Sequence, residues 1–332
     1  MRAKKVTIKD VAKESGVSIA TVSQILNGNT QNFSTKTVAK VLKIKDTLNY
    51  EPDYFARRMI IKKSKTIGVL VPDITNPFFN QLIRGIEDSL YKENFVTMLC
   101  NADLDKTREI KALEELGRRS VDGLIIATPN VSNEQIHKIV QNQKIPYIVL
   151  DQKKADPNGS DAILTDDFTG GYLAASHLKE LGHEQVAVVM PTKAAENIQQ
   201  RLAGFQSVYG TSCKVILTEL SKKGGKDAVP QIMQTNVTAI FAINDELAFG
   251  IYLGLSQSNK KIPEDYSVIG YDNVDMCEYV TPQLTTIAQP IFELGQVTAQ
   301  LLLERIQFPE KNWEEKKLPV KLMKRFSTAY LK

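Results

Sequence analysis

The spacing of apolar residues changes character near residue 65. Between Ile8 and Leu48 they recur every three or four positions, which is typical of one face of a helix, and residues 16–18 interrupt the pattern once. This predicts two short helices joined by a tight turn, followed by a third helix that ends at about Leu48. Ser18 and Ser34 are placed to cap the second and third helices through their hydroxyl groups. The N-terminal part is therefore expected to fold as a small helical unit.

Beyond residue 65, short apolar runs alternate with longer amphipathic stretches. The runs are apolar throughout, as in parallel strands buried on both faces, and the stretches between them have helical spacing. The predicted strands are 67–71, 96–100, 123–127, 147–150, 186–190, 239–243 and 268–271, and the predicted helices are 79–93, 107–118, 169–181, 197–208, 245–257 and 291–306. This alternation predicts an α/β fold with two doubly wound parallel-sheet subdomains, for which about 265 residues suffice.

Charge is unevenly distributed along the chain. Residues 1–65 contain 14 Lys and Arg against 5 Asp and Glu, a net charge of +9, and the remaining residues contain 28 against 33, a net charge of −5. A basic segment on an acidic body is typical of a protein in which one part neutralises phosphates. The basic residues are interleaved with apolar ones at helical spacing, which argues against a merely solvated basic tail.

Composition and motifs disfavour several classes of protein. The three cysteines form no CxxC pair, the N-terminus lacks the apolar stretch of a signal peptide, and no apolar run reaches the roughly 18 residues of a membrane span. The sequence contains no GxSxG, Walker, strand-linked GxGxxG or HExxH motif. Residues 224–226 are interpreted as a turn, and His137, His177 and His183 as surface or capping residues. We therefore expect a reduced, cytoplasmic protein that is not an enzyme and needs no metal or cofactor.

Two long segments carry a resemblance to a known family. The segment VTIKDVAKESGVSIATVSQILNG, followed by LNYEPDYFARRM, resembles the headpiece and hinge of LacI/GalR transcription regulators, and the resemblance extends to LPVKLMKRFST near the C-terminus. It implies a helix-turn-helix DNA-binding headpiece (residues 1–50), a hinge helix and linker (51–65), and a sugar-sensing and dimerisation core of two periplasmic-binding-protein-type subdomains (66–332). The implied partners are operator double-stranded DNA, a small sugar effector and a second copy of the chain.

The resemblance also assigns the residues that contact DNA. Ile19, Ala20, Thr21 and Gln24 would face base edges in the major groove, while Thr7, Ser18 and Ser23 would face phosphates. The Gln24 amide suits an adenine, and the first two side chains offer only apolar contact. In the hinge, Met59 stands where the family has a minor-groove Leu wedge, and Arg57 would contact the minor groove or a phosphate.

Candidate effector-binding residues follow the predicted strand ends, where ligands bind in doubly wound folds. They are Asn76, Phe78, Phe79, Thr128, Asp151, Thr165, Arg201, Asn244, Tyr271, Asp272 and Gln289. Carboxylates, amides and a guanidinium pair with hydroxyl groups, and aromatic faces pack against the C–H faces of a sugar. Most of the set resembles the pockets of ribose-binding relatives, although Gln152 replaces an Arg there, so another pentose or hexose stays open.

The resemblance implies a homodimeric repressor whose operator affinity is controlled by a small sugar, with ribose the leading candidate. Within the same class, the effector could instead be a purine, a phosphosugar or a phosphorylated protein. A sugar-binding transport protein would need a signal peptide and would not explain the +9 segment. An enzyme on a doubly wound fold would need a nucleophile or a cofactor loop. The sequence leaves open whether the effector induces or corepresses.

Overall fold

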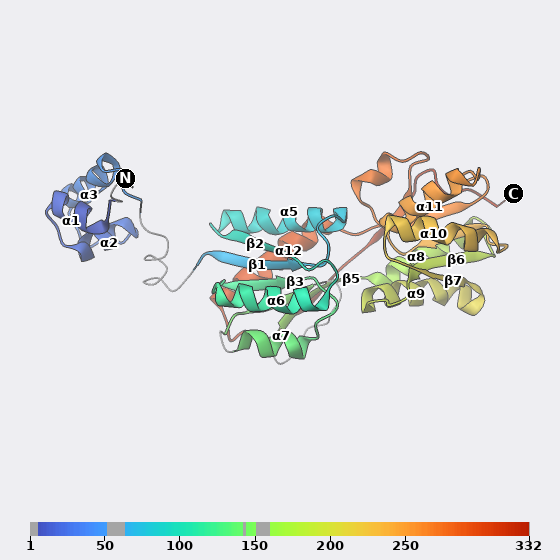
Figure 1. The fold of residues 1–332 in the computed structure, drawn as a ribbon, viewed down its shortest axis with the longest axis horizontal. Coiled ribbons are helices and arrows are strands. Elements are labelled where there is room, and N and C mark those ends of the chain that lie inside the picture. The colour runs from blue at the N-terminus through green and yellow to red at the C-terminus, as the bar shows by residue number, and fades with distance from the viewer. Residues whose placement is uncertain (1–5, 52–63, 142–143, 151–159, 332) are drawn as a thin grey trace. The chain divides into compact units, whose positions relative to one another are not determined.

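The computed structural model describes residues 6–51, 64–141, 144–150 and 160–331. The chain divides into two compact units, Met1–Ser64 and Lys65–Lys332 (Figure 1). Residues 52–63 of the predicted hinge helix and linker lie outside the described residues. No helix in the described ranges combines the length and the apolar character needed to cross a membrane.

Three helices form the smaller unit: α1 (Ile8–Ser15), α2 (Ile19–Leu26) and α3 (Thr35–Thr47). Gly16 ends α1 in the left-handed conformation, with φ 67°, which turns the chain sharply into α2. The Ser18 hydroxyl accepts a hydrogen bond from the Thr21 backbone N–H at 3.1 Å, as the sequence predicts for a cap. A small core of Val11, Ala12, Val22, Ile25, Val41 and Tyr50 holds the three helices together.

The larger unit contains two six-stranded sheets within the described residues. The first has the order β11-β5-β4-β3-β1-β2, with β1 (Thr66–Val71), β2 (Val96–Asn101), β3 (Gly123–Ile126), β4 (Tyr147–Leu150), β5 (Ser160–Thr165) and β11 (Glu315–Leu318). The second has the order β12-β10-β9-β8-β6-β7, with β6 (Val186–Pro191), β7 (Lys214–Thr218), β8 (Ala239–Ala242), β9 (Ser267–Asp272), β10 (Thr285–Ala288) and β12 (Lys321–Met323). Strand pairing is parallel except between β10 and β12.

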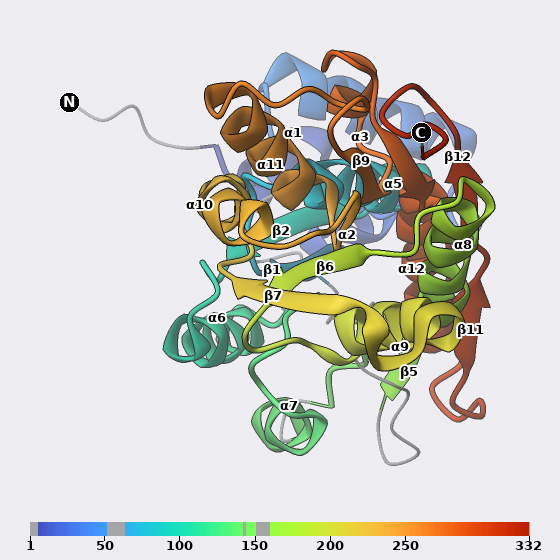
Figure 2. The same ribbon diagram turned by 90° about the vertical axis from the view of Figure 1, so that its right-hand side faces the viewer.

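Helices cover both faces of each sheet. In the first subdomain, α5 (Pro77–Lys92) and α12 (Ile291–Gln307) share one core with the sheet, while α6 (Lys106–Arg118) and α7 (Asn133–Val140) share the other. In the second subdomain, α8 (Asp167–Glu180) packs on α9 (Glu196–Tyr209), and α10 (Lys222–Met233) packs on α11 (Asp245–Gln257), as Figure 2 shows. The chain passes between the subdomains after β5, after β10 and between β11 and β12. The predicted headpiece and doubly wound architecture is therefore confirmed.

The interpretation of residues 224–226 as a turn is wrong. Gly224 and Gly225 are buried inside α10, where a Cβ atom at Gly225 would lie 2.1 Å from the Leu247 carbonyl oxygen. The glycines therefore permit the close packing of α10 against α11. The sequence signal was misread because glycine serves close helix contacts as well as turns.

The interpretation of His177 and His183 as surface residues is also wrong, because both are buried in the second subdomain. His183 Nδ1 lies 2.8 Å from Thr238 Oγ1, and its Nε2 lies 3.0 Å from both Ser267 Oγ and the Ala329 carbonyl oxygen. His177 Nε2 lies 2.9 Å from Thr328 Oγ1. The two imidazoles thus fasten the C-terminal segment to the second sheet. Burial lowers the pKa of both side chains.

Candidate functional site

The predicted DNA-reading helix is α2, and it has two distinct faces. Val22 and Ile25 are buried against the other headpiece helices, whereas Ile19, Ala20 and Gln24 are exposed. Ile19 is 44% exposed, so it is not a core residue of the headpiece. Thr21 and Ser23 are half-buried beside this face. Its side chains are short apart from Ile19 and Gln24, which allows the helix backbone to approach a flat or grooved partner closely.

The residues predicted to meet phosphates lie at helix starts. Thr7 precedes α1 and is exposed, and its backbone N–H and hydroxyl both donate to Asp10 Oδ2, at 2.8 and 2.7 Å. Ser18 precedes α2. Backbone N–H groups at helix N-termini attract anions, which favours a phosphate contact at Ser18, whereas the donors of Thr7 are directed to the Asp10 carboxylate. The hinge candidates Arg57 and Met59 lie outside the described residues.

The larger unit contains a cleft with a cavity of about 420 Å³ between its two subdomains. Its lining comes from the ends of strands and the loops that follow them, as expected for a doubly wound fold. The first subdomain contributes Pro72, Asp73, Asn76, Phe78, Phe79, Leu104, Pro129 and Asn130. The second contributes Pro191, Lys193, Ala194, Ala195, Asn197, Ile198, Arg201, Leu220, Asn244 and Asp272, and Gln289 follows β10 at a crossover.

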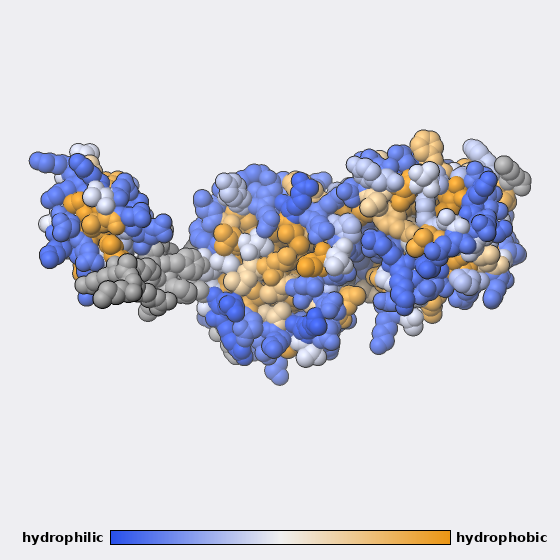
Figure 3. All heavy atoms as spheres, turned by 45° about the horizontal axis from the view of Figure 1, so that its top comes forward, coloured by the Kyte–Doolittle hydropathy of each residue, from blue (hydrophilic) through white to orange (hydrophobic). Residues whose placement is uncertain are grey.

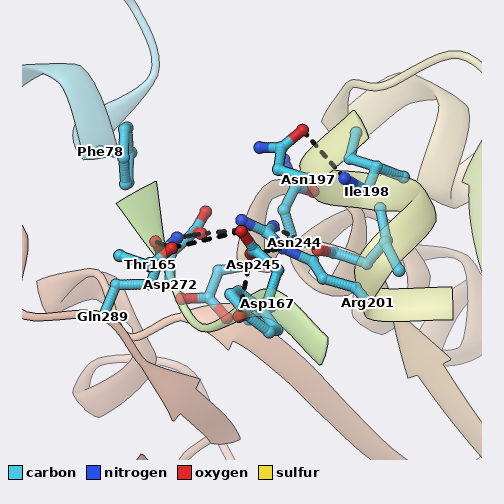
Figure 4. Close-up of polar contacts among 12 residues, drawn as sticks. Phe78, Thr165, Asp167, Asn197, Ile198, Arg201, Asn244, Asp245, Asp272 and Gln289 are labelled. Carbon is cyan, nitrogen blue, oxygen red and sulfur yellow. Dashed lines mark hydrogen bonds and ion pairs between the residues drawn. The ribbon is translucent and has the colours of Figure 1, made fainter. Parts of the chain in front are cut away.

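Arg201 is the centre of a charged cluster on the second-subdomain wall of the cleft (Figure 4). Its Nε donates to Asp167 Oδ1 at 2.8 Å, and its Nη1 donates to the Ile243 carbonyl oxygen at 2.9 Å and lies 3.7 Å from Asp272 Oδ1. The guanidinium also stacks 3.7 Å from the centre of the Tyr271 ring. Arg201 is only 4% exposed, so these contacts hold its charge in one position.

Asp167 and Tyr271 lie behind Arg201 and do not line the cavity. The Tyr271 hydroxyl donates to Asp167 Oδ1 at 3.0 Å. Burial raises the pKa of Tyr271 well above its usual value, and the Asp167 carboxylate raises it further, so the hydroxyl keeps its proton. Asp167 thus accepts hydrogen bonds from both Arg201 and Tyr271, and it fixes the position of the Arg201 guanidinium in the cleft.

Gln289 connects the cavity to the segment after β5, where the chain first passes between the subdomains. Its Nε2 donates to Asp272 Oδ1 at 2.7 Å, and its Oε1 accepts a hydrogen bond from the Thr165 hydroxyl at 2.8 Å. Thr165 ends β5 and does not itself line the cavity. Asp272 ends β9 with φ 119°, an unusual backbone conformation for a non-glycine residue. Such strain of about 1–3 kcal/mol is most often found at functional sites.

Two of the four asparagines of the lining, Asn76 and Asn244, cap helices with their carbonyl oxygens. Asn76 Oδ1 accepts from the Phe78 backbone N–H at 3.0 Å, and Asn244 Oδ1 accepts from the Leu247 backbone N–H at 2.9 Å. Each amide NH₂ group is thereby left to donate toward the cavity. Phe78 and Phe79 pack edge to face with ring centres 5.0 Å apart, and both line the cavity although they are nearly buried.

The cleft thus brings together seven of the predicted effector residues: Asn76, Phe78, Phe79, Arg201, Asn244, Asp272 and Gln289. Thr165 and Tyr271 lie behind them, Thr128 is buried away from the lining, and Asp151 lies outside the described residues. Sequence reasoning missed Asn130, although the strand-end rule could have found it. It also missed Asn197, which precedes Arg201 by one helical turn on α9.

The cleft offers hydrogen-bond donors, acceptors and aromatic faces, a combination that suits a polyhydroxylated ligand. Within the described residues, no group of three or more His, Cys, Asp or Glu side chains could hold a metal ion. The cavity therefore has the character of a binding site for a small polar molecule.

Two family models match the chain and leave residues 54–63 unmatched between them. The model described as "Bacterial regulatory proteins, lacI family" matches residues 7–53, and that described as "Periplasmic binding proteins and sugar binding domain of LacI family" matches residues 64–326. The HTH-type transcriptional regulator DegA of Bacillus subtilis is 34% identical over 98% of this chain and 99% of its own length.

Solved structures are similar to the same regions. A LacI family regulator from Enterococcus faecalis V583, solved with bound ribose, is 67% identical, with a TM-score of 0.77 over 80% of this chain and 100% of that chain. The lac repressor dimer, bound to operator and the anti-inducer ONPF, is 27% identical, with a TM-score of 0.86 over 98% of this chain and 100% of that chain.

Proposed function

The chain belongs to the LacI family of DNA-binding transcriptional regulators, which are not enzymes, and on that premise we propose a repressor that binds operator DNA as a homodimer under the control of ribose. In this proposal residues 1–50 form the headpiece, 51–65 the hinge and 66–332 the sensing core. The protein acts in the cytoplasm, where the operator lies.

Ribose is favoured by the chemistry of the cleft. Arg201, Asp272 and Gln289 form one cluster, joined by an ion pair and a hydrogen bond to Asp272, that offers both donors and acceptors to neighbouring hydroxyl groups. Phe78 and Phe79 supply apolar faces from the opposite wall. The single observation that carries the proposal is this convergence in a cavity of about 420 Å³. The ribose-bound regulator from Enterococcus faecalis, 67% identical to this chain, supports the same ligand.

Operator reading is assigned to the exposed face of α2. The Gln24 amide suits an adenine, and Thr21 reads a further base edge, while Ile19 and Ala20 contact thymine methyl groups. Thr7, Ser18 and Ser23 would meet phosphates, where they position the helix without reading sequence. In the hinge, Met59 is assigned to the minor groove as the apolar wedge, and Arg57 to the minor groove or a phosphate.

A second copy of the chain would cover apolar surface on the first subdomain. Figure 3 shows apolar side chains gathered on one face there, and the exposed large apolar residues of this subdomain include Tyr91, Val96 and Leu99 on α5 and β2. Contiguous apolar surface of this kind is typical of protein interfaces. The similar lac repressor structure is a dimer on its operator, which supports the same assembly here.

Control by ribose requires different ribose affinities in the two states of the core, and such a coupling is typically about 1–3 kcal/mol. The Thr165–Gln289 hydrogen bond connects the cavity directly to a crossover between the subdomains. Ribose that engages Gln289 and the first-subdomain wall together would draw the subdomains closer and change the geometry presented to the hinge.

The proposal is tested by a thermal-shift panel of pentoses, hexoses, purines and phosphosugars on the full-length protein, followed by operator binding with each positive ligand. Ligand at about 100 times its dissociation constant adds about 2.7 kcal/mol to the free energy of unfolding. We expect a shift with ribose and a change in operator affinity, whose direction distinguishes induction from corepression. A shift with only a purine or a phosphosugar would refute ribose and leave the DNA-binding role intact.

A further inference from the structure

Glu109 is a buried carboxyl group beside the cleft. It lies in the first turn and a half of α6 and is 0% exposed. Its Oε1 accepts a hydrogen bond from Asn130 Nδ2 at 2.8 Å, while its Oε2 is buried with no hydrogen-bond partner in the described part of the chain. Burying a carboxylate is unfavourable unless it is well paired, and most buried polar atoms are bonded. The one side chain that bonds to this buried carboxyl group is Asn130, so a role for Glu109 is to be sought in what it does to Asn130.

The orientation of the Asn130 amide follows from its two partners. Nδ2 donates to Glu109 Oε1 at 2.8 Å and to the Leu104 carbonyl oxygen at 3.1 Å. An amide nitrogen carries two hydrogens, so both are used. A carboxylate and a carbonyl oxygen can only accept, so the NH₂ group, and not the oxygen, must lie between them. Asn130 lines the cavity, and the polar atom it retains for a ligand is Oδ1.

We propose that Glu109 is a positioning residue that fixes Asn130 with its side-chain oxygen toward the cavity, so that the first-subdomain wall selects an effector hydroxyl that donates a hydrogen bond. The inference rests on the proposed sugar-sensing function and specifies one contact within it. The contact between Glu109 and Asn130 links α6 to the loop after β3.

The same arrangement disfavours a phosphate on this side of the cleft. Asp73 lines the same wall, so a phosphoryl group would face the Asn130 oxygen and a carboxylate together. The cationic residues of the cavity lining, Lys193 and Arg201, both come from the second subdomain. Phosphate oxygens that face these two acceptors would find no hydrogen-bond donor there and would be repelled by the negative charge. The wall therefore favours a free sugar over its phosphate ester at this position.

The test in solution is calorimetric titration of the full-length protein with D-ribose and each of its single-deoxy analogues. In the unmodified protein, the analogue that lacks the hydroxyl facing Asn130 should bind about 3- to 10-fold more weakly than ribose, the range expected for one neutral hydrogen bond. In Asn130→Ala, this penalty should vanish while the penalties for the other analogues persist. In Glu109→Gln, whose amide can donate to Asn130 as well as accept, the same penalty should shrink.

Glu114→Gln is the matched control, because it makes the same chemical change at an exposed position of α6. It should leave every penalty unchanged. If no analogue has a penalty that depends on Asn130, or if Glu109→Gln behaves like Glu114→Gln, the inference is overturned.

A second measurement separates this inference from the ribose proposal, because it needs no ligand. The side-chain amide signal of Asn130 in the nitrogen-15 NMR spectrum is identified by its loss in Asn130→Asp. We expect this signal to move and its hydrogens to exchange faster in Glu109→Gln but not in Glu114→Gln. Failure of ribose to bind the unmodified protein refutes the ribose proposal alone, whereas an unmoved amide signal in Glu109→Gln refutes the positioning role.

Discussion

The two walls of the cleft hold their polar groups in different ways. On the second-subdomain wall, Arg201, Asp167 and Asp272 are charged and nearly buried, and both carboxylates pair with the guanidinium. On the first-subdomain wall, Asn76 caps its own helix beside an aromatic pair, and Asn130 is held by Glu109. One wall is a charged network that exists before any ligand arrives, and the other offers mainly neutral groups to it.

The difference suggests that the two walls contribute separately to ribose affinity and to the operator response. A preorganised charged network loses little freedom when a ligand binds, so the second-subdomain wall should supply most of the affinity. In the proposed mechanism the first-subdomain wall moves to the ligand, so its contacts should contribute to closure and hence to the change in operator affinity. Substitutions on the two walls are therefore expected to separate ribose binding from the operator response.

The largest effect is expected from Arg201→Ala. Removing the guanidinium leaves Asp167 and Asp272 as buried carboxylates without their cation, and breaking a buried ion pair in this way costs about 3–5 kcal/mol. Ribose affinity should fall by more than about 100-fold, measured by calorimetry. Operator binding without ribose should persist, measured by fluorescence anisotropy, and Arg118→Ala on the exposed side of α6 is the control. A normal ribose response in Arg201→Ala would contradict the assignment of this wall.

Asp167→Asn should have the next largest effect, although Asp167 does not line the cavity. The amide oxygen can still accept from Arg201 or Tyr271, but the negative charge that holds the guanidinium is lost. Hydrogen bonds to charged groups contribute about 1.5–3 kcal/mol, so we expect ribose to bind about 10- to 100-fold more weakly. Asp227→Asn, at an exposed pair on α10, serves as the control. Unchanged affinity would show that Arg201 needs no support from behind.

Phe78→Leu tests the first-subdomain wall and should have a smaller effect on affinity. The substitution keeps an apolar group against the ligand but removes the ring face and its edge contact with Phe79. We expect ribose affinity to fall about 3- to 10-fold, corresponding to roughly 0.5–1.5 kcal/mol. At saturating ribose, however, the change in operator affinity should also be reduced. If saturation restores the full response, the proposed division between the walls is wrong.

Much of the fold and part of the cleft could be predicted from the sequence, because both depend on local patterns. Strand-end positions identified Asn76 and Arg201, which the structure brings into one cavity. The edge strand β7 was missed because its apolar run is only the three residues between Lys214 and Thr218, too short to mark a buried strand. The supporting carboxylates were missed for another reason. Asp167 meets Arg201 across 34 positions and Glu109 meets Asn130 across 21, and no local pattern encodes such pairs.

The smallest effect, a dependence of stability on pH, should distinguish the subdomains that bear the two walls. Burial lowers the pKa of His177 and His183 in the second subdomain. As the pH falls, these two side chains therefore bind protons in the unfolded chain before they do so in the folded chain. The stability from neutral histidines is present above the unfolded pKa of about 6.5 and is lost as pH falls below it. The melting temperature of the second subdomain should therefore decrease between about pH 7.5 and 6.

Asp245 changes the pH dependence of folding stability in the opposite direction from the two histidines, and does so at lower pH. Burial raises its pKa to about 6, against hydrogen bonds from Thr286, Cys277 and the backbone that lower it. The folded state thus takes up a proton that the unfolded state takes up only near pH 4, so stability is gained as pH falls through this interval. Melting curves of His183→Gln should be flatter than those of the unmodified protein between pH 7.5 and 6, and those of Asp245→Asn should differ below pH 6. If His183→Gln keeps the full slope, buried histidines do not set the acid sensitivity of the second subdomain.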